Sequence, residues 1–468
     1  MFAGAIFLGA CGGQPAPTTT APSTSTTTTA PSRSSSSTIS VHATAPQVGG
    51  AADWLMYGRS GARTGVGPAQ PTLSASAVRV AWTGDMLDGE IYAQPLVDEG
   101  RVVAATEGGT LYGLDLRTGH QLWQTHLADP ATTVMPCGNI QPLGITGTPA
   151  IDPSTHIVYA VGERTDGSHL LGAVDDRSGD LRWARVVDPP GMIPANQQQR
   201  AALIVANGHV YVAFGGLLGD CATYHGWVVG VALDGQGDLL DYRVPSGNKA
   251  GIWAASGIAV GDDGSLYVAD GNSVSQSDYD HGEALIRLDP ALHELGFTAP
   301  DDWAFLNAHD LDVGSTGPIL LPGGLAAVGA KDSKLHVSAI AHLGGVGTEA
   351  AADPVCDTRA GAFGGMAASD RRLYVPCSDT LVAADVDPAG HATVVWRGRA
   401  LRPPILAYGA VWGMDLLGTD TLHAIDPASG RVLASVVVGP TQNFVTPSAV
   451  AGFVLVGAKS RVVAVAAS

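Results

Sequence analysis

The chain has 468 residues, of which 45% are hydrophobic and 15% are charged, so its main body has the composition of a globular protein. Its formal net charge is −18, which argues against binding to a nucleic-acid backbone, because such binding needs clustered Lys and Arg. The 61 glycines exceed the usual share of about 7%, as is typical of folds built from many strands and turns.

The first eleven residues resemble a lipoprotein signal. Residues 2–8 are apolar, and the sequence LGAC ends at Cys11. The segment lacks a positive n-region and its apolar stretch is short, so we expect the translation start to lie upstream of Met1. The alternative is a cysteine that follows an apolar segment by chance. We predict that Cys11 is lipidated and that residues 1–11 are the signal segment.

A Thr/Ser/Pro-rich segment follows and extends to residue 50. It has too few large apolar side chains to form a core, so residues 12–50 are predicted to be a disordered tether. Together with a lipid anchor, the tether would hold residues 51–468 outside the cytoplasmic membrane.

A repeated spacing of Asp, Gly and Trp organises the remaining chain. Asp115, Gly119 and Trp123 lie four residues apart, in a strand–turn–strand pattern. Asp accepts backbone hydrogen bonds in such turns, and Gly supplies the positive φ that they need. The spacing returns at Asp175 and, less regularly, at Asp385, Asp426 and elsewhere, at intervals of about 40 to 60 residues that are typical of propeller blades.

We therefore predict an all-β, eight-bladed propeller of four-stranded antiparallel blades. Seven blades are expected at residues 92–127, 144–187, 199–244, 251–297, 313 to about 340, 361–397 and 402–438. Residues 443–466 supply only three strands. The strand at Ala77–Thr83 would complete this eighth blade and close the ring, which removes the open sheet edges.

Four cysteines lie in the propeller region, none in a CxxC pair. Cys137, Cys221, Cys356 and Cys377 are all expected on the face formed by the between-blade loops and the hairpins between second and third strands. Four cysteines allow three pairings. Cys137–Cys221 would tie neighbouring blades together and Cys356–Cys377 would close a short excursion within one blade, each in an oxidising compartment. The alternative is four free buried thiols.

The longest loops of the same face hold the candidate site residues. These are Tyr224, His225, Trp227, Trp253, Asp301, Asp302, His309, Asp310 and Asp312. They could line a pocket at the mouth of the central channel, with carboxylates as bases or cation ligands and Trp as a stacking surface. Alternatively, the tryptophans pack between blades, the aspartates cap a turn, and the histidines are satisfied within their loops. No His-x-His or HExxH spacing indicates a metal site.

Residues Leu111–Trp123 resemble the pyrroloquinoline-quinone (PQQ) repeat of quinoprotein dehydrogenase-like propellers. Further stretches similar to this family are GITGTPAID at 144–152, YHGWVVG at 224–230, SLYVADGN at 265–272 and DLDVGSTGPILL at 310–321. The family includes quinone-dependent alcohol and sugar dehydrogenases and also non-enzymatic lipoproteins that assist outer-membrane assembly. The resemblance implies the fold for residues 51–468, but the fold does not decide between these activities.

The dehydrogenase alternative implies PQQ, calcium and an Asp base, for which Asp310 is the candidate by resemblance. The adjacent cysteines common in such enzymes, a calcium-ligand Glu and a CxxCH haem motif are missing from the sequence. We therefore expect a non-catalytic, monomeric, lipid-anchored module outside the cytoplasmic membrane, without a cofactor, that binds an envelope protein, a polymer or a small ligand. The alternatives are a secreted PQQ-dependent oxidoreductase and a purely structural envelope protein.

Overall fold

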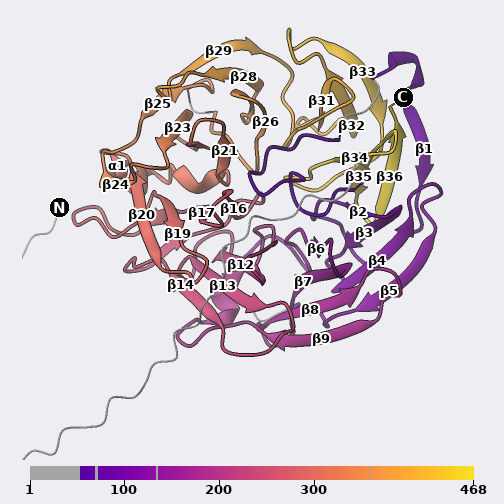
Figure 1. Cartoon of the computed structure of the whole chain (residues 1–468), viewed down its shortest axis with the longest axis horizontal. Coiled ribbons are helices and arrows are strands. Elements are labelled where there is room, and N and C mark those ends of the chain that lie inside the picture. Colours follow the sequence, from indigo (N-terminus) through magenta and orange to yellow (C-terminus); the bar gives the residue numbers. More distant parts are fainter. Residues whose placement is uncertain (1–52, 69–71, 133–134, 359, 468) are drawn as a thin grey trace, which may run out of the picture. The chain divides into compact units, whose positions relative to one another are not determined.

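The computed structural model describes residues 53–68, 72–132, 135–358 and 360–467. The predictions for Cys11, the signal segment and the tether therefore lie outside the described residues. Within the described ranges, eight four-stranded antiparallel blades are present, so the predicted eight-bladed propeller is confirmed. Figure 1 shows the blades around a central axis. A separate two-stranded sheet pairs β15 (Lys249–Gly251) with β18 (Gly271–Ser273). No helix in these ranges combines the length and the apolar character needed to span a membrane.

The strands of each blade follow one another from the axis to the rim. Blades 1 to 4 consist of β2 (Leu96–Asp98), β3 (Arg101–Ala105), β4 (Thr110–Asp115) and β5 (Gln121–His126); β6 (Ala150–Asp152), β7 (Ile157–Glu163), β8 (His169–Asp175) and β9 (Leu181–Val186); β11 (Ile204–Ala206), β12 (His209–Gly216), β13 (Trp227–Ala232) and β14 (Leu240–Arg243); and β16 (Ala259–Val260), β17 (Leu266–Ala269), β19 (Leu285–Leu288) and β20 (Glu294–Ala299). Blades 5 to 7 consist of β21 (Ile319–Leu321), β22 (Leu325–Gly329), β23 (Lys334–Ala339) and β25 (Ala351–Pro354); β26 (Ala367–Ser369), β27 (Arg372–Pro376), β28 (Leu381–Val386) and β29 (Ala392–Arg397); and β30 (Ile405–Ala407), β31 (Ala410–Met414), β32 (Thr421–Ile425) and β33 (Val432–Val437).

The eighth blade closes the ring as predicted. It consists of β34 (Ser448–Val450), β35 (Phe453–Ala458), β36 (Arg461–Ala466) and, at its outer edge, the N-terminal strand β1 (Arg79–Thr83). Strand β1 pairs antiparallel with β36, with Arg79 opposite Ala466 and Thr83 opposite Val463. The N-terminal strand therefore joins the two ends of the propeller.

The fifth blade differs from its predicted extent. We expected it to end near Ile340, but its outer strand β25 begins at Ala351. The intervening strand β24 (Gly344–Val346) instead pairs in parallel with β20 of blade 4, with Phe297 opposite Gly344. The prediction was wrong here because a Gly-rich segment that adds to a neighbouring sheet has no alternating apolar pattern of its own.

The Asp–Gly–Trp spacing joins consecutive blades. Asp115 Oδ1 accepts the backbone N–H groups of the turn, and Gly119 closes that turn at a φ of 75°. The indole Nε1 of Trp123 donates to the carbonyl of Asp176 in blade 2, at 2.6 Å. A Cβ on Gly179 would lie 2.9 Å from the Trp123 side chain, so the glycine of one repeat accommodates the tryptophan of the preceding repeat.

The same contact recurs around the rim. Trp183 donates to Leu233 O at 3.1 Å, Trp396 to Pro427 O at 2.9 Å, and Trp82 of the closing strand to Leu116 O at 3.0 Å. The turn of a repeat contacts the preceding blade, and its tryptophan contacts the following blade. Blade 7 therefore keeps Gly430, which packs against Trp396 of blade 6, although Ala434 stands where its own tryptophan would be.

An N-terminal segment, residues 54–67, fills the axis of the propeller. It lies near the centre of Figure 1, and its backbone bonds to inner strands of successive blades. The guanidinium of Arg63, which is only 1% exposed, donates to the carbonyls of Ile258, Leu203 and Tyr57, at 2.7, 3.1 and 2.8 Å. The sequence did not predict this axial segment, which ties the blades together from inside.

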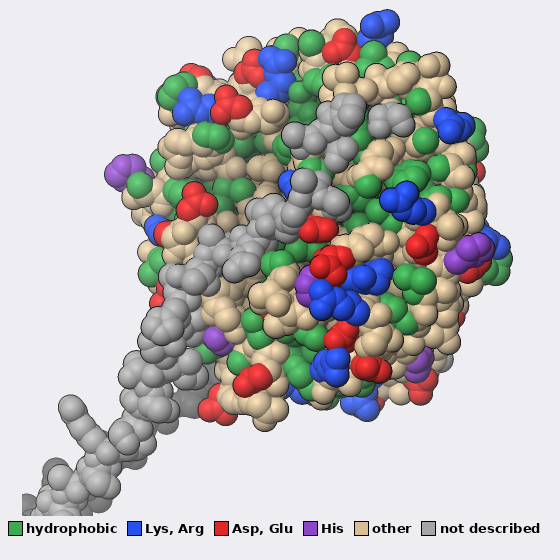
Figure 2. Space-filling model, turned by 45° about the vertical axis from the view of Figure 1, so that its right-hand side comes forward, with side chains coloured by type: hydrophobic (Ala, Val, Ile, Leu, Met, Phe, Trp, Pro, Cys, Tyr) green, Lys and Arg blue, Asp and Glu red, His purple; other side chains and the backbone are tan. Residues whose placement is uncertain are grey.

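Blade 5 contains a buried ionic cluster. The imidazole of His336 contacts Glu349 Oε1 at 2.9 Å and Asp332 Oδ1 at 3.2 Å. Burial alone would lower the pKa of His336, but the two carboxylates raise it to about 10, so this imidazole is charged at neutral pH. On the face seen in Figure 2, acidic and basic side chains likewise lie close to one another.

Candidate functional site

A cavity of about 660 Å³ lies on the face where the long loops were expected. Its lining comes from the loops before blades 3, 4, 5, 6 and 8 and from the hairpins of blades 3, 4 and 5. The residues are Gln198, Arg200, Gly216, Leu217, Leu218, Gly219, Asp220, Tyr224, Trp253, Asn272, Asp310, Asp312, Lys331, Phe363 and Phe444. A cavity of this size, with largely apolar walls and a few charged groups, is typical of small-molecule sites.

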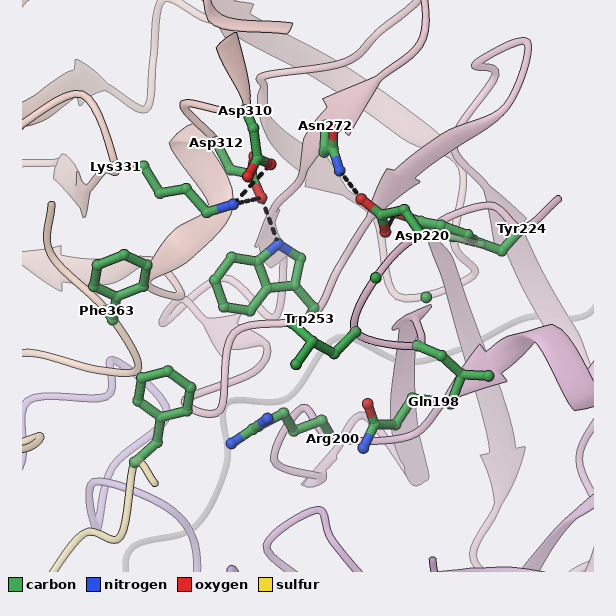
Figure 3. Close-up of a pocket in the computed structure, with 15 residues that line it drawn as sticks. Gln198, Arg200, Asp220, Tyr224, Trp253, Asn272, Asp310, Asp312, Lys331 and Phe363 are labelled. Atoms are coloured by element: carbon green, nitrogen blue, oxygen red, sulfur yellow. Dashed lines mark hydrogen bonds and ion pairs between the residues drawn. The ribbon is translucent and has the colours of Figure 1, made fainter. Parts of the chain in front are cut away.

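Lys331 holds two aspartates at one side of the cavity (Figure 3). Its Nζ lies 2.9 Å from Asp310 Oδ1 and 3.0 Å from Asp312 Oδ2. The indole Nε1 of Trp253 donates to Asp312 Oδ2 at 3.0 Å, and Lys331 Nζ lies 5.4 Å from the Trp253 ring centroid. Lys331 therefore neutralises part of the negative charge beside the indole.

Asp312 is the most buried of these acids. It is 2% exposed, and its Oδ1 has no hydrogen-bond partner among the described residues. Burial raises the pKa of Asp312 to about 6, against the opposing effect of Lys331. Burial also acts on Lys331, but the two carboxylates hold its pKa above the usual value. Asp312 thus places a largely buried carboxylate at the wall of the cavity, with one oxygen that no described group satisfies.

A second polar group surrounds Asp220 on the hairpin of blade 3. Its Oδ1 accepts the Tyr224 hydroxyl at 2.7 Å, its Oδ2 accepts the Asn272 side-chain amide, and Lys249 Nζ lies 3.6 Å away. Buried Glu283 supports this arrangement from behind, because its Oε1 accepts the backbone N–H of Asn272 at 2.8 Å. Burial raises the pKa of Glu283 to about 8.

The backbone around the cavity adopts left-handed conformations at several residues other than glycine. The φ angles are 47° at Asp220, 67° at Asn272 and 56° at Asp310, and Lys249 and Ala250 have φ angles of 65° and 57°. Asp and Asn tolerate this region better than most residues, but each instance still carries strain. Such residues cluster at functional sites, where the surrounding structure holds them in place.

The opposite side of the cavity is aromatic and basic. The Arg200 guanidinium carbon lies 4.6 Å from the ring centroid of Phe444 and 6.0 Å from that of Tyr92. Phe444 in turn stacks with Phe363, with ring centroids 6.3 Å apart. In Figure 3, Arg200 and Gln198 lie on one side of Trp253, and the two aspartates with Lys331 lie on the other.

The disulfides have the pairing that we considered for this face. Cys137–Cys221 and Cys356–Cys377 are both formed, with Cα separations of 6.2 and 5.6 Å. The first borders the cavity, because a Cβ on Gly219 would lie 3.7 Å from the Cys137 sulfur. This disulfide therefore fixes the loop that carries Asp220.

The structure brings together only part of the sequence-predicted set. Trp253, Asp310, Asp312 and Tyr224 line the cavity. The Asp312 side chain contacts Trp253 and Lys331, so the alternative of simple turn capping does not describe it. Trp227 is 3% exposed within β13, opposite Phe214, which agrees with its alternative role in packing.

Both candidate histidines lie outside the cavity lining. The His309 ring nitrogen contacts Phe305 O at 2.8 Å at the end of helix α1 (Trp303–His309), and that of His225 contacts Ser246 Oγ at 3.2 Å. Burial lowers the pKa of His225. Asp301 and Asp302 also lie outside the lining, with Asp302 3.6 Å from Lys334.

Sequence reasoning missed several lining residues. They are Gln198, Arg200, Asp220, Asn272, Lys331, Phe363 and Phe444. Asp220 could have been noticed beside Cys221, and Asn272 lies within the stretch SLYVADGN that carries the family resemblance. Arg200 and Lys331 stand in no motif.

Comparison with known proteins identifies the repeat and the fold. Residues 64–217 match the family model described as outer membrane protein assembly factor BamB. No curated protein sequence matches the chain. Similar solved structures include a quinohemoprotein alcohol dehydrogenase from Pseudomonas putida HK5, with a TM-score of 0.68 and 14% identity over 89% of this chain and 80% of that one.

Two further structures are similar at the same level. A europium-containing methanol dehydrogenase gives a TM-score of 0.67 and 13% identity over 90% of this chain and 98% of that one. BamB from Moraxella catarrhalis gives a TM-score of 0.59 and 12% identity over 83% of this chain and 99% of that one. At these identities the likeness concerns the fold alone.

Proposed function

Since this chain is a PQQ-like β-propeller, we propose that it works as a small-molecule-binding propeller and that the cavity beside Trp253 is its binding site. One observation carries the proposal: the buried oxygen Oδ1 of Asp312 lacks a hydrogen-bond partner among the residues described, in a residue that lines the cavity. An unsatisfied buried carboxylate oxygen is costly, and a bound donor would satisfy it.

A small ligand accounts for this face better than a protein or polymer partner. The cavity of about 660 Å³ falls within the range of about 300–1,000 Å³ that is usual for small-molecule pockets. Its polar groups converge on a concave site and include Asp220, Asn272 and Lys331. An envelope protein or polymer as partner remains an alternative that no contact in the structure specifically favours.

We further propose that the propeller works outside the cytoplasmic membrane, anchored through Cys11. Two disulfides support this location, because disulfides persist in oxidising compartments. Membrane fractionation of cells that express the full chain tests the anchor. Labelling with radioactive palmitate should mark the wild-type chain and not a Cys11→Ser variant; equal labelling of both would contradict the anchor.

A thermal-shift screen of small polar aromatic and sugar compounds tests the binding function. Ligands that raise the melting temperature of the wild-type protein should lose that effect in Trp253→Ala and Asp312→Asn variants. Trp183→Phe is the control, because the indole of Trp183 also donates a hydrogen bond, to Leu233 O, but lies at the rim. If the ligands stabilise Trp253→Ala and the wild type equally, the cavity is not the site.

Quinone-dependent oxidation is the second candidate function. It is favoured by Asp310 and Lys331 beside the face of Trp253, since an acid–base pair next to a flat aromatic surface suits a planar redox cofactor. An alcohol or sugar substrate would lose the hydrogen of its carbinol carbon together with two electrons, as a hydride, to a bound quinone. Asp310, which is paired with Lys331, would accept the substrate's hydroxyl proton.

The residues fit the quinone better than they fit calcium. Calcium takes six to eight oxygen ligands, but in the described ranges no three His, Cys, Asp or Glu side chains gather as metal donors. The Lys331 ammonium already lies between the carboxylates of Asp310 and Asp312. A calcium ion would therefore have to compete with Lys331 for these oxygens.

Reconstitution decides between the two functions. Purified protein is mixed with PQQ, with and without calcium, and is assayed for the quinone spectrum and for dye reduction with alcohols and sugars. Tight binding and dye reduction that Asp310→Asn abolishes would establish the oxidoreductase. Failure to bind PQQ, with other ligands still bound, would leave the non-catalytic binding function.

A further inference from the structure

Arg200 differs from the arginines that form ion pairs elsewhere in the propeller. Among the residues described, no carboxylate pairs with it, and its hydrogen bond to the carbonyl of Asn443 is long, at 3.5 Å. By contrast, Arg101 contacts Asp176 at 2.7 Å. Arg200 therefore presents a cation to the cavity without a protein anion to balance it.

The buried acid Glu107 does not balance the positive charge of Arg200. Glu107 acts on Arg200, but it is 2% exposed and accepts the N–H of Gly144 and the hydroxyl of Thr146, both at 2.7 Å. Burial raises the pKa of Glu107 to about 8, so its carboxyl is largely uncharged at neutral pH. Burial lowers the pKa of Arg200 to about 10, which leaves the guanidinium protonated.

The aromatic contacts of Arg200 orient it but do not supply an anion. Its guanidinium lies over the ring of Phe444, and the ring face attracts the cation. Guanidinium groups bind carboxylates through two parallel N–H···O bonds. A ligand carboxylate would satisfy both the charge and the N–H groups of Arg200.

The other basic group of the cavity is already occupied. Lys331 contacts Asp310 and Asp312 at 2.9 and 3.0 Å, so it carries two carboxylates of the protein itself. A ligand anion is therefore directed to Arg200. The unpartnered Oδ1 of Asp312, on the other side of Trp253, calls for a donor on the ligand.

We propose that the cavity selects aromatic carboxylates that carry a hydroxyl group at the far end, with the carboxylate on Arg200, the ring against Trp253 and the hydroxyl donating to Asp312. This inference rests on the proposed binding function and specifies its ligand class. The walls between the two polar ends suit a flat ring, because they include Trp253, Phe363 and Phe444.

The test compares acids with matched neutral compounds by isothermal titration calorimetry. The probes are 4-hydroxybenzoate, 4-hydroxybenzamide, benzoate and cyclohexanecarboxylate, titrated into the wild-type protein. We expect 4-hydroxybenzoate to bind at least about tenfold more tightly than its amide, since a hydrogen bond between two charged groups is stronger than one to a neutral group. Benzoate should bind more weakly because it lacks the hydroxyl, and cyclohexanecarboxylate because it lacks the flat ring.

Variants assign the preference to its residue. Arg200→Gln should reduce the preference for acid over amide to within about threefold, and Arg200→Lys should retain part of it. Arg402→Gln is the matched control, because Arg402 contacts the same neighbour, Asn443, at 3.0 Å but does not line the cavity. Unchanged melting temperatures would show that each variant is folded.

The outcomes separate the ligand class from the binding function. If acid and amide bind the wild type equally, and Trp253→Ala abolishes both, the carboxylate subsite is wrong but the cavity remains a binding site. If Arg200→Gln keeps the preference for the acid, Arg200 is not the subsite. If none of the four probes binds the wild type, the proposed ligand class is refuted. The thermal-shift screen then tests separately whether the cavity binds any ligand.

Discussion

Replacement of Arg63 by Met tests whether the axial segment holds the blades together. The guanidinium makes three hydrogen bonds, to the carbonyls of Ile258, Leu203 and Tyr57. Hydrogen bonds from a charged donor contribute about 1.5–3 kcal/mol each, so the three amount to roughly 4–9 kcal/mol before other effects. Removing a buried charge that has only neutral partners recovers part of its desolvation cost.

We therefore expect Arg63→Met to lower the free energy of unfolding by about 3 kcal/mol. Arg59→Met is the matched control: Arg59 lies on the same segment but is partly exposed, and we expect a loss below about 1 kcal/mol. Urea unfolding at pH 7, followed by tryptophan fluorescence, gives both values. If the two variants lose the same stability, the axial segment is not a structural tie between blades.

Three further measurements test other parts of the propeller. Because the pKa of His336 is raised to about 10, its stabilising effect is complete below its unfolded pKa of about 6.5 and is lost as the pH rises toward 10. Between pH 7 and 9.5, the free energy of unfolding of the wild type should therefore fall by roughly 3 kcal/mol more than that of His336→Gln. Equal decreases in the two proteins would contradict this. Replacing both Cys356 and Cys377 by Ser should lower the free energy of unfolding by about 2–4 kcal/mol under oxidising conditions, and the difference from the wild type should vanish once both proteins are fully reduced. Trp183→Phe should cost about 1 kcal/mol, through the lost indole hydrogen bond, and Trp183→Ala clearly more; equal costs would mean that the ring is not packed against the next blade.

The ring could be predicted from the sequence because its interactions are local and repeated. Asp115, Gly119 and Trp123 form a turn and a docking group within nine residues, so the pattern is visible along the chain. The closing strand followed from counting, since the last blade lacked a fourth strand. The axial segment was missed because its partners are spread over many blades and leave no periodic signal in residues 54–67.

The site could be predicted only in part, for a related reason. Asp310 and Asp312 lie two residues apart and were visible as a motif. Their partner Lys331 belongs to the hairpin of blade 5, and Arg200 to the loop before blade 3. Residues that the fold brings together from separate loops have no common sequence pattern. The pairing of Lys331 with Asp310 and Asp312 depends on the tertiary structure and cannot be read from the sequence.

The arrangement of the hairpins separates the groups that hold the ring from those that line the cavity. In an antiparallel blade, the turn between the third and fourth strands lies at the opposite end from the hairpin between the second and third. The Asp115 turn, which supports the tryptophan contacts, belongs to the first kind, and the loops that carry Asp220 and Lys331 belong to the second. Substitutions in the cavity, such as Arg200→Gln, should therefore leave the rim contacts intact. For this reason a loss of binding in that variant would report on the ligand rather than on the fold.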